Sequence, residues 1–155
     1  MYATLFTTIT ALAASALATP VAPRQVAVID TYFNGNNFQE GCSPGGCEAS
    51  FNLSSAADEA SGMPAFNVVC HPIYGQKNYV NCIPNVPLQD GETVAAWWYD
   101  AADRDDIGLQ VSHIWSTDPA NSNTASSLNA TGSVEFPAAD VTNFSVHVTK
   151  LEAIQ

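Results

Sequence analysis

Apolar and polar residues alternate with a period of two along most of this chain, and this alternation constrains the fold more than any other feature of the sequence. The clearest example is residues 47–54, where Cys47, Ala49, Phe51 and Leu53 fall on one face of an extended chain and polar residues fall on the other. Helical periodicity is scarce. The pattern therefore predicts an all-β fold.

Runs of this kind recur along the chain, separated by turn-forming residues. We expect strands over 26–33, 47–54, 65–71, 78–83, 93–99, 108–117, 133–136 and 143–153. Turns are expected at 34–37, 72–77 and 100–107, and a long surface loop at 118–131, while the polar connector 55–64 has room for one helical turn. Such spacing is typical of an antiparallel β-sandwich or β-barrel. We expect one such domain over 26–155.

The amino-terminal residues are predicted to be a signal peptide. Residues 1–18 carry no charged side chain and end in Ala16-Leu17-Ala18, a pattern that signal peptidase accepts. A transmembrane anchor is the alternative, but the apolar run is shorter than the roughly 20 residues that a span requires. Residues 19–25 are then a linker or a short pro-segment, with possible cleavage after Arg24. The leader predicts a secreted, extracellular protein.

Four cysteines lie in the predicted domain: Cys42, Cys47, Cys70 and Cys82. An even count in a secreted chain is typical of two disulfides, with three possible pairings. We favour Cys70–Cys82 because these residues flank a predicted hairpin, and Cys42–Cys47 would then close the tight loop 43–46. A zinc site is disfavoured because Cys70 and Cys82 are too far apart in sequence to form a second zinc knuckle.

The charge of the chain limits its partners. Four Lys and Arg residues stand against 15 Asp and Glu residues, for a net charge of −11. Such a surface repels phosphate backbones and anionic lipids, so we expect neither nucleic-acid binding nor membrane insertion. Only 12% of the residues are charged, so solubility depends on polar residues and on glycans if the sequons at Asn52, Asn129 and Asn143 are used.

The sequence contains no recognisable catalytic motif. There is no Gly-x-Ser-x-Gly elbow, and every cysteine is assigned to a disulfide. His71, His113 and His147 are scattered, and His113 shares an apolar strand face, which is typical of a core or rim histidine. An acidic hydrolase would need three carboxylates in one pocket, and no motif surrounds the scattered acids Glu40, Glu48, Asp58, Glu92 and Glu135. We expect no catalytic residue, no metal and no cofactor.

The densest charged segment is the turn with Asp100, Asp103, Arg104, Asp105 and Asp106. One interpretation is a Ca²⁺ site, because hard cations bind several carboxylate oxygens. The other is a solvated hairpin turn in which the arginine partly neutralises its neighbours. The segment lacks the glycine and the distal glutamate of the helix-loop-helix calcium motif, which favours the second interpretation.

Two adjacent tryptophans precede this turn. Trp97 and Trp98 must point to opposite faces of a strand, so one is expected in the core and the other outside. An outer tryptophan is either covered by a loop or free to stack on a sugar ring or anchor a protein partner. The candidate recognition surface therefore consists of Trp97, Trp98, Tyr99, Asp100, Asp103, Asp105 and Asp106.

Several segments together resemble a known family. They are an apolar strand that ends at Cys70 and is followed by Tyr79-Val80-Asn81-Cys82, the strand Val94-Ala95-Ala96-Trp97-Trp98-Tyr99-Asp100 with Asp103-Arg104, and Gly108-Leu109-Gln110-Val111. Two further segments carry the same resemblance: the leader ending in Arg24-Gln25, and the late segment Gly132-Ser133-Val134-Glu135-Phe136-Pro137-Ala138-Ala139-Asp140. On these residues the chain resembles the small secreted fungal proteins typified by the major Alternaria allergen and the hypersensitive-response-inducing elicitors.

The resemblance implies a secreted β-barrel or β-sandwich with a Cys70–Cys82 bridge, no known catalysis, and a role at the host interface as an effector or elicitor of plant defence. The allergen's unpaired cysteine, which links a dimer, and its carboxy-terminal cysteine pair are missing, so we expect a monomer; the pair Cys42 and Cys47 resembles the elicitor-type relatives. The leading hypothesis is non-enzymatic recognition of a plant protein or cell-wall component. A carbohydrate-binding module is the alternative, and a small acidic hydrolase is a third hypothesis.

Overall fold

The computed structural model describes residues 30–103, 105–118, 126–137 and 141–154. The predicted leader and linker lie outside these ranges. The described residues form nine strands and no helix, which confirms the all-β prediction, and they therefore include no helix that could cross a membrane. The strands are β1 (Tyr32–Ser43), β2 (Gly46–Ser55), β3 (Phe66–Cys70), β4 (Val80–Asn81), β5 (Ile83–Pro84), β6 (Thr93–Asp100), β7 (Asp106–Ser116), β8 (Ser127–Pro137) and β9 (Asn143–Ile154).

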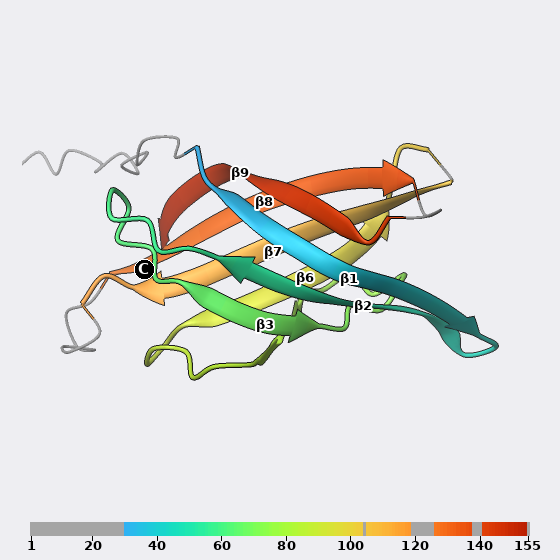
Figure 1. The fold of residues 1–155 in the computed structure, drawn as a ribbon, viewed down its shortest axis with the longest axis horizontal. Coiled ribbons are helices and arrows are strands. Elements are labelled where there is room, and N and C mark those ends of the chain that lie inside the picture. The colour runs from blue at the N-terminus through green and yellow to red at the C-terminus, as the bar shows by residue number, and fades with distance from the viewer. Residues whose placement is uncertain (1–29, 104, 119–125, 138–140, 155) are drawn as a thin grey trace, which may run out of the picture.

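All nine strands belong to one antiparallel sheet that curls into a nearly closed barrel (Figure 1). The order across the sheet is β4-β6-β7-β8-β9-β1-β2-β3-β5. The β6-β7-β8-β9 portion is a meander of sequential neighbours, and β1 pairs with β9, so the first and last strands of the described residues are neighbours in the middle of the sheet. Of the two predicted architectures, the structure has the barrel.

The barrel closes at one short segment that belongs to both edges of the sheet. Only Cys82 separates β4 from β5; β4 pairs with β6, whereas β5 pairs with β3. The Cys82 amide donates to the carbonyl of Val94 at 2.8 Å, and its sulfur is bonded to Cys70 on β3. The disulfide thus links the two edges across this seam. The second disulfide joins Cys42 and Cys47, so both predicted pairings are confirmed.

Inward-facing residues fill the barrel with a continuous apolar core. On β2, the buried residues are Ala49, Phe51 and Leu53, as the alternation predicted, and Ser55 at the end of the strand. The core also contains side chains from every long strand and from the β2–β3 connector, the largest fully buried ones being Trp115, Phe33, Phe51, Leu53, Met63, Leu109 and His113. The apolar positions of the period-two pattern are therefore the residues that face the interior of the barrel.

One predicted turn is wrong. Residues 34–37 lie within β1, which runs from Tyr32 to Ser43. These turn-forming residues lie at a β-bulge instead. The register with β2 shifts between Asn36 and Gln39, and Asn37 has a φ of 56°. Gly35 is required for packing, because a Cβ there would lie 2.1 Å from the ring of Phe144. Of the predicted strand 26–33, residues 26–29 lie outside the described residues, and of the remaining four only the last two belong to β1.

Other predicted boundaries also change. Of the surface loop expected over 118–131, residues 119–125 lie outside the described residues. Residues 127–131 belong to β8 instead, because small and polar residues alternate there as a strand and Leu128 and Ala130 are buried against the core. No helical turn forms in 55–64, where Asp58 and Met63 instead bridge a tight turn. The strand expected over 78–83 is divided into β4 and β5 by the seam.

Candidate functional site

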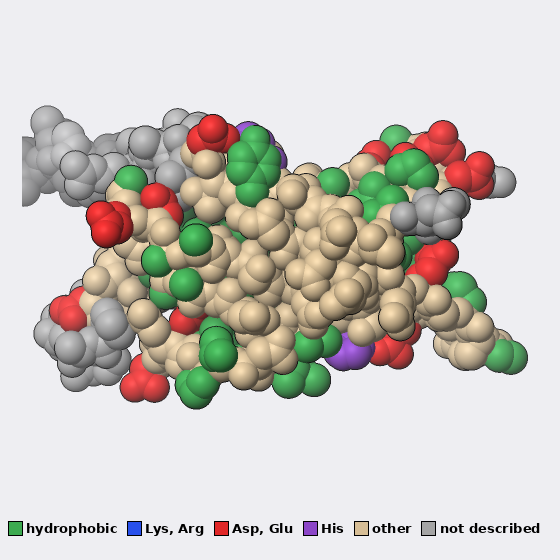
Figure 2. All heavy atoms as spheres, in the orientation of Figure 1, with side chains coloured by type: hydrophobic (Ala, Val, Ile, Leu, Met, Phe, Trp, Pro, Cys, Tyr) green, Lys and Arg blue, Asp and Glu red, His purple; other side chains and the backbone are tan. Residues whose placement is uncertain are grey.

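A pocket of about 700 Å³ lies at the end of the barrel where the β1–β2 hairpin and the β6–β7 turn project (Figure 1). Figure 2 shows this end notched between the two projections, with acidic side chains gathered beside the notch. The lining residues are Glu40, Cys42, Cys47, Tyr74, Trp98, Asp100, Ala101, Asp103, Asp105, Asp106 and Ile107. We call this site the acidic–aromatic pocket.

One wall of the pocket is held in place by the Cys42–Cys47 disulfide and the loop that follows β3. The disulfide joins directly opposed residues of the β1–β2 hairpin. The loop is tied to β2 by two backbone hydrogen bonds, from Ala49 N to Pro72 O at 3.0 Å and from Tyr74 N to Cys47 O at 2.9 Å. Tyr74 is therefore fixed beside the disulfide.

Two aromatic rings form the apolar part of the pocket. Trp98 points inward from β6 and is only 6% exposed, whereas Tyr74 is 47% exposed. Their ring centroids lie 5.3 Å apart at an interplanar angle of 62°, an edge-to-face contact. The Tyr74 hydroxyl donates a hydrogen bond to Asp100 Oδ1 at 2.5 Å. This bond, together with the negative charge of Asp100, raises the pKa of Tyr74.

Carboxylates supply most of the polar lining. The five acidic side chains are Glu40, Asp100, Asp103, Asp105 and Asp106, and no Lys or Arg of the described residues lines the pocket. Within the turn, Asp103 Oδ1 accepts from the Asp105 amide and the Asp103 carbonyl accepts from the Asp106 amide, both at 3.2 Å. Arg104 lies outside the described residues. Ionised carboxylates only accept hydrogen bonds, so the pocket presents an excess of acceptors and of negative charge.

The structure brings together five of the seven residues of the predicted recognition surface. Trp98, Asp100, Asp103, Asp105 and Asp106 line the pocket, and Trp97 and Tyr99 lie on the outer face of the barrel. The prediction that the two tryptophans face opposite ways is confirmed. Glu40 and Tyr74 were missed as members of this site. Their contribution depends on the hairpin disulfide and the β3–β4 loop, which bring distant segments to the same end of the barrel.

The outer residues form a row of aromatic rings. Trp97 lies 6.2 Å from Tyr79 and 5.9 Å from Tyr99 between ring centroids, beside a groove of about 300 Å³ that also contains Gly75, Gln76 and Lys77. Burial raises the pKa of both tyrosines, so each ring is partly packed against the barrel. Trp97 is half-buried. This second feature is called the outer aromatic row.

The three histidines do not converge. His71 lies 3.2 Å from Glu48 at the surface, and His147 is 3.6 Å from Asp30 and stacks on Tyr32. No group of three or more His, Cys, Asp or Glu side chains among the described residues is placed to hold a metal ion. The calcium interpretation of the acidic turn therefore gains no support from the described residues.

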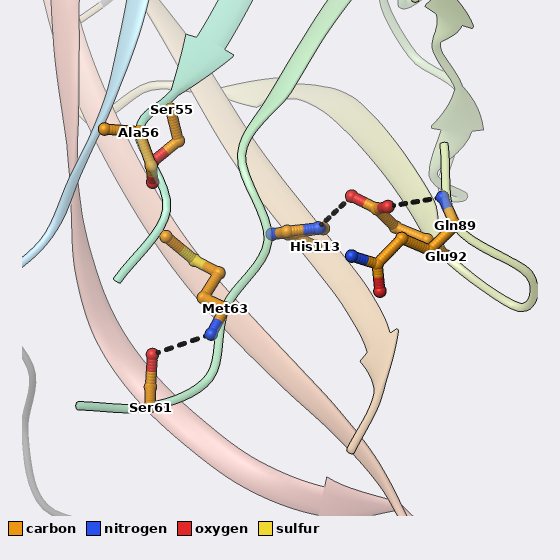
Figure 3. A network of polar contacts seen from close by, with 7 residues as sticks. All are labelled: Ser55, Ala56, Ser61, Met63, Gln89, Glu92 and His113. Atoms are coloured by element: carbon orange, nitrogen blue, oxygen red, sulfur yellow. Dashed lines mark hydrogen bonds and ion pairs between the residues drawn. The ribbon is translucent and has the colours of Figure 1, made fainter. Parts of the chain in front are cut away.

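His113 was predicted to lie either in the core or at its rim, and it is buried in the core. Its Nε2 lies 2.9 Å from Glu92 Oε1, and Glu92 Oε2 accepts from the Gln89 amide at 2.8 Å (Figure 3). Burial lowers the pKa of His113, against an opposing hydrogen bond and charge from Glu92. Within the part of the chain that the structure describes, His113 Nδ1 and Trp115 Nε1 have no hydrogen-bond partner. Because His113 and Glu92 are both buried, they cannot contact a solute, and the role of this pair is structural.

The three sequons differ in their surroundings. Asn143 is exposed at the start of β9. Asn52 is on the outer face as expected, but it is half-buried and its Nδ2 donates to Asn36 Oδ1 at 3.1 Å. Asn129 is also half-buried and accepts from Ser112 Oγ at 2.8 Å. A glycan on Asn143 would therefore disturb fewer side-chain contacts than one on either of the others.

Comparison with known proteins finds no family model, no curated protein and no solved structure that matches this chain.

Proposed function

We propose that this chain is a secreted, non-enzymatic protein of the effector or elicitor type that recognises a plant component through the acidic–aromatic pocket. The observation that carries the proposal is convergence: β1, the β3–β4 loop, β6 and the β6–β7 turn contribute side chains to one concave site of about 700 Å³. Binding sites for small ligands and peptide segments are concave, and small-ligand sites span about 300–1,000 Å³.

Two further observations support the proposal. The two disulfides are consistent with an extracellular protein, since such bonds persist in oxidising compartments. The resemblance to secreted fungal elicitors rests on segments that include Trp98, Asp100 and Asp103, which line the pocket. The proposed recognition site therefore shares these three residues with the segments on which the resemblance rests.

The same pocket meets the stated requirement of the hydrolase hypothesis, because more than three carboxylates line it. A glycosidase also needs a general acid that an apolar environment keeps protonated. Glu40, Asp100, Asp103 and Asp105 are exposed, and only Asp106 is half-buried. The lining thus favours binding over general-acid catalysis, and a reducing-sugar assay on cell-wall polysaccharide would contradict this choice if product accumulated.

The experiment compares two tyrosine variants of the secreted protein on leaf tissue. Tyr74→Ala removes the exposed aromatic wall of the pocket, and Tyr32→Ala removes a tyrosine with the same 47% exposure that stacks on His147 instead. We expect cell death or defence induction with the wild type and with Tyr32→Ala, and its loss with Tyr74→Ala at matched circular dichroism. Equal activity of both variants would refute the proposed site.

The outer aromatic row favours a second function, carbohydrate binding. Exposed aromatic rings stack on sugars, and Trp97 has aromatic neighbours on both sides. Their interplanar angles of 63° and 56° do not form a flat platform, which places this function second. Pull-down on chitin, cellulose and xylan tests it: retention that Trp97→Ala abolishes would support a carbohydrate-binding module, and full recovery in the unbound fraction would exclude binding to these polymers.

A further inference from the structure

We propose that the acidic–aromatic pocket binds a basic peptide segment of a protein partner, with a lysine or arginine side chain seated against Tyr74 and surrounded by the carboxylates. This inference rests on the proposed function and names the chemistry of the recognised component. It follows from three properties of the pocket: its hydrogen-bonding inventory, its aromatic wall, and the distribution of its charge.

The hydrogen-bonding inventory requires a ligand rich in donors. Among the described lining residues, only Tyr74 and Trp98 carry side-chain donors, and the Tyr74 hydroxyl is already used by Asp100. The carboxylates are acceptor-only when ionised. Lys ammonium and Arg guanidinium groups are donor-only, so they complement this lining. A neutral sugar can also donate its hydroxyl hydrogens to these carboxylates, but it carries no positive charge to offset theirs.

The aromatic wall adds a specific contact for a cation. Tyr74 is held by its hydrogen bond to Asp100 and its edge-to-face contact with Trp98, so its ring is ordered before binding. Nearly half of its surface remains exposed. A cation over such a ring gains cation–π attraction, and the long stem of Lys or Arg covers the apolar surface beside it. Ile107, Ala101 and the Cys42–Cys47 bridge provide that apolar surface.

The charge is spread over opposite walls, which favours a multivalent ligand. Glu40 comes from β1, whereas Asp103 and Asp105 come from the β6–β7 turn. The described lining holds five carboxylates and no Lys or Arg. A peptide with several basic residues pairs its cationic groups with the separated carboxylates, while the apolar stems of the same side chains cover the apolar patches. The net charge of −11 would steer such a partner toward the protein.

The test is calorimetric titration of the mature protein with a short, capped peptide of alternating lysine and glycine. The pocket variant is Glu40→Gln with Asp105→Asn, which removes one exposed charge from each wall. The matched control is Glu59→Gln with Asp90→Asn, which changes the same residue types and total charge at exposed positions in the connectors 56–65 and 85–92, outside the pocket. We expect saturable binding, weakened about tenfold in the pocket variant and unchanged in the control.

Three outcomes would overturn the inference: no binding of the peptide, equal weakening in both variants, which would indicate only the overall charge, or equally tight binding of spermidine, which would indicate a small-cation site. The leaf assay separates this inference from the proposed function. If leaf activity requires Tyr74 but the peptide does not bind, the pocket is functional and its ligand is not basic. If the peptide binds at the pocket but Tyr74→Ala remains fully active in leaf, the proposed function fails.

Discussion

Removal of the Cys70–Cys82 disulfide should destabilise the protein far more than removal of Cys42–Cys47. In the chain-entropy model, closing loops with sequence separations of 12 and 5 residues contributes about 3 and about 2 kcal/mol respectively. Loop length alone therefore predicts a difference of only about 1 kcal/mol. The position of the first bridge at the barrel seam predicts a larger difference.

Two structural features enlarge the expected loss at the seam. Cys70 and Cys82 are 0% and 8% exposed, whereas Cys42 is exposed, so Cys→Ala changes at the seam also remove buried sulfur packing worth about 1 kcal/mol per residue. The seam strands β4 and β5 each contribute only two residues to the sheet, so few other contacts hold its edges together. The expected losses are then about 5 kcal/mol for Cys70→Ala with Cys82→Ala and about 2 kcal/mol for the hairpin pair.

The assay is urea unfolding at neutral pH without reductant, followed by tryptophan fluorescence, on the wild type and both double-alanine variants. Losses in the free energy of unfolding that agree to within about 1 kcal/mol would refute the argument from the seam, because loop length would then explain both. If the seam variant is already unfolded before urea is added, it has lost the whole free energy of unfolding, which is about 5–15 kcal/mol for ordinary domains. That outcome supports the argument from the seam.

Three further predictions concern the packing and the polar contacts of the barrel. Gly132→Ala should cost about 1–3 kcal/mol, because its Cβ would lie 2.2 Å from the backbone oxygen of His147, whereas Gly41→Ala, with nothing within 4 Å, should be nearly neutral; thermal unfolding of the two variants checks this. The lowered pKa of His113 means that the unfolded chain takes up a proton near pH 6.5 and the folded chain does not, so stability should be full above pH 6.5 and fall as the pH drops below it. His113→Gln should flatten that dependence in urea midpoints measured from neutral to mildly acidic pH, and an unchanged slope would exclude His113 as its cause. Asp58→Ala should cost about 1 kcal/mol, because Asp58 accepts from Ser61 Oγ at 2.6 Å and from two backbone amides, while Glu59→Ala should have no measurable effect on the urea midpoint.

Much of the local structure was predictable because strand periodicity is a local property. The alternation over 47–54, the opposite directions of Trp97 and Trp98 and the two disulfide pairings all depend on residues close together in the chain. The errors occurred where a local composition that is typical of a turn lies in a segment that packs against residues far away in the chain. Residues 34–37 have the composition of a turn, but Phe144 from β9 covers Gly35 and the strand continues.

The sequence by itself determined that this chain forms an antiparallel all-β domain with two short-range disulfides and a negatively charged surface. Only the tertiary structure decided that the sheet closes into a barrel, because that closure depends on Cys82 bonding to both edges at once. It also decided the composition of the pocket: Glu40 and Tyr74 meet Trp98 and the acidic turn through strand register and the tethered β3–β4 loop. Contacts between residues far apart in the chain depend on the register of intervening strands, which no local pattern specifies.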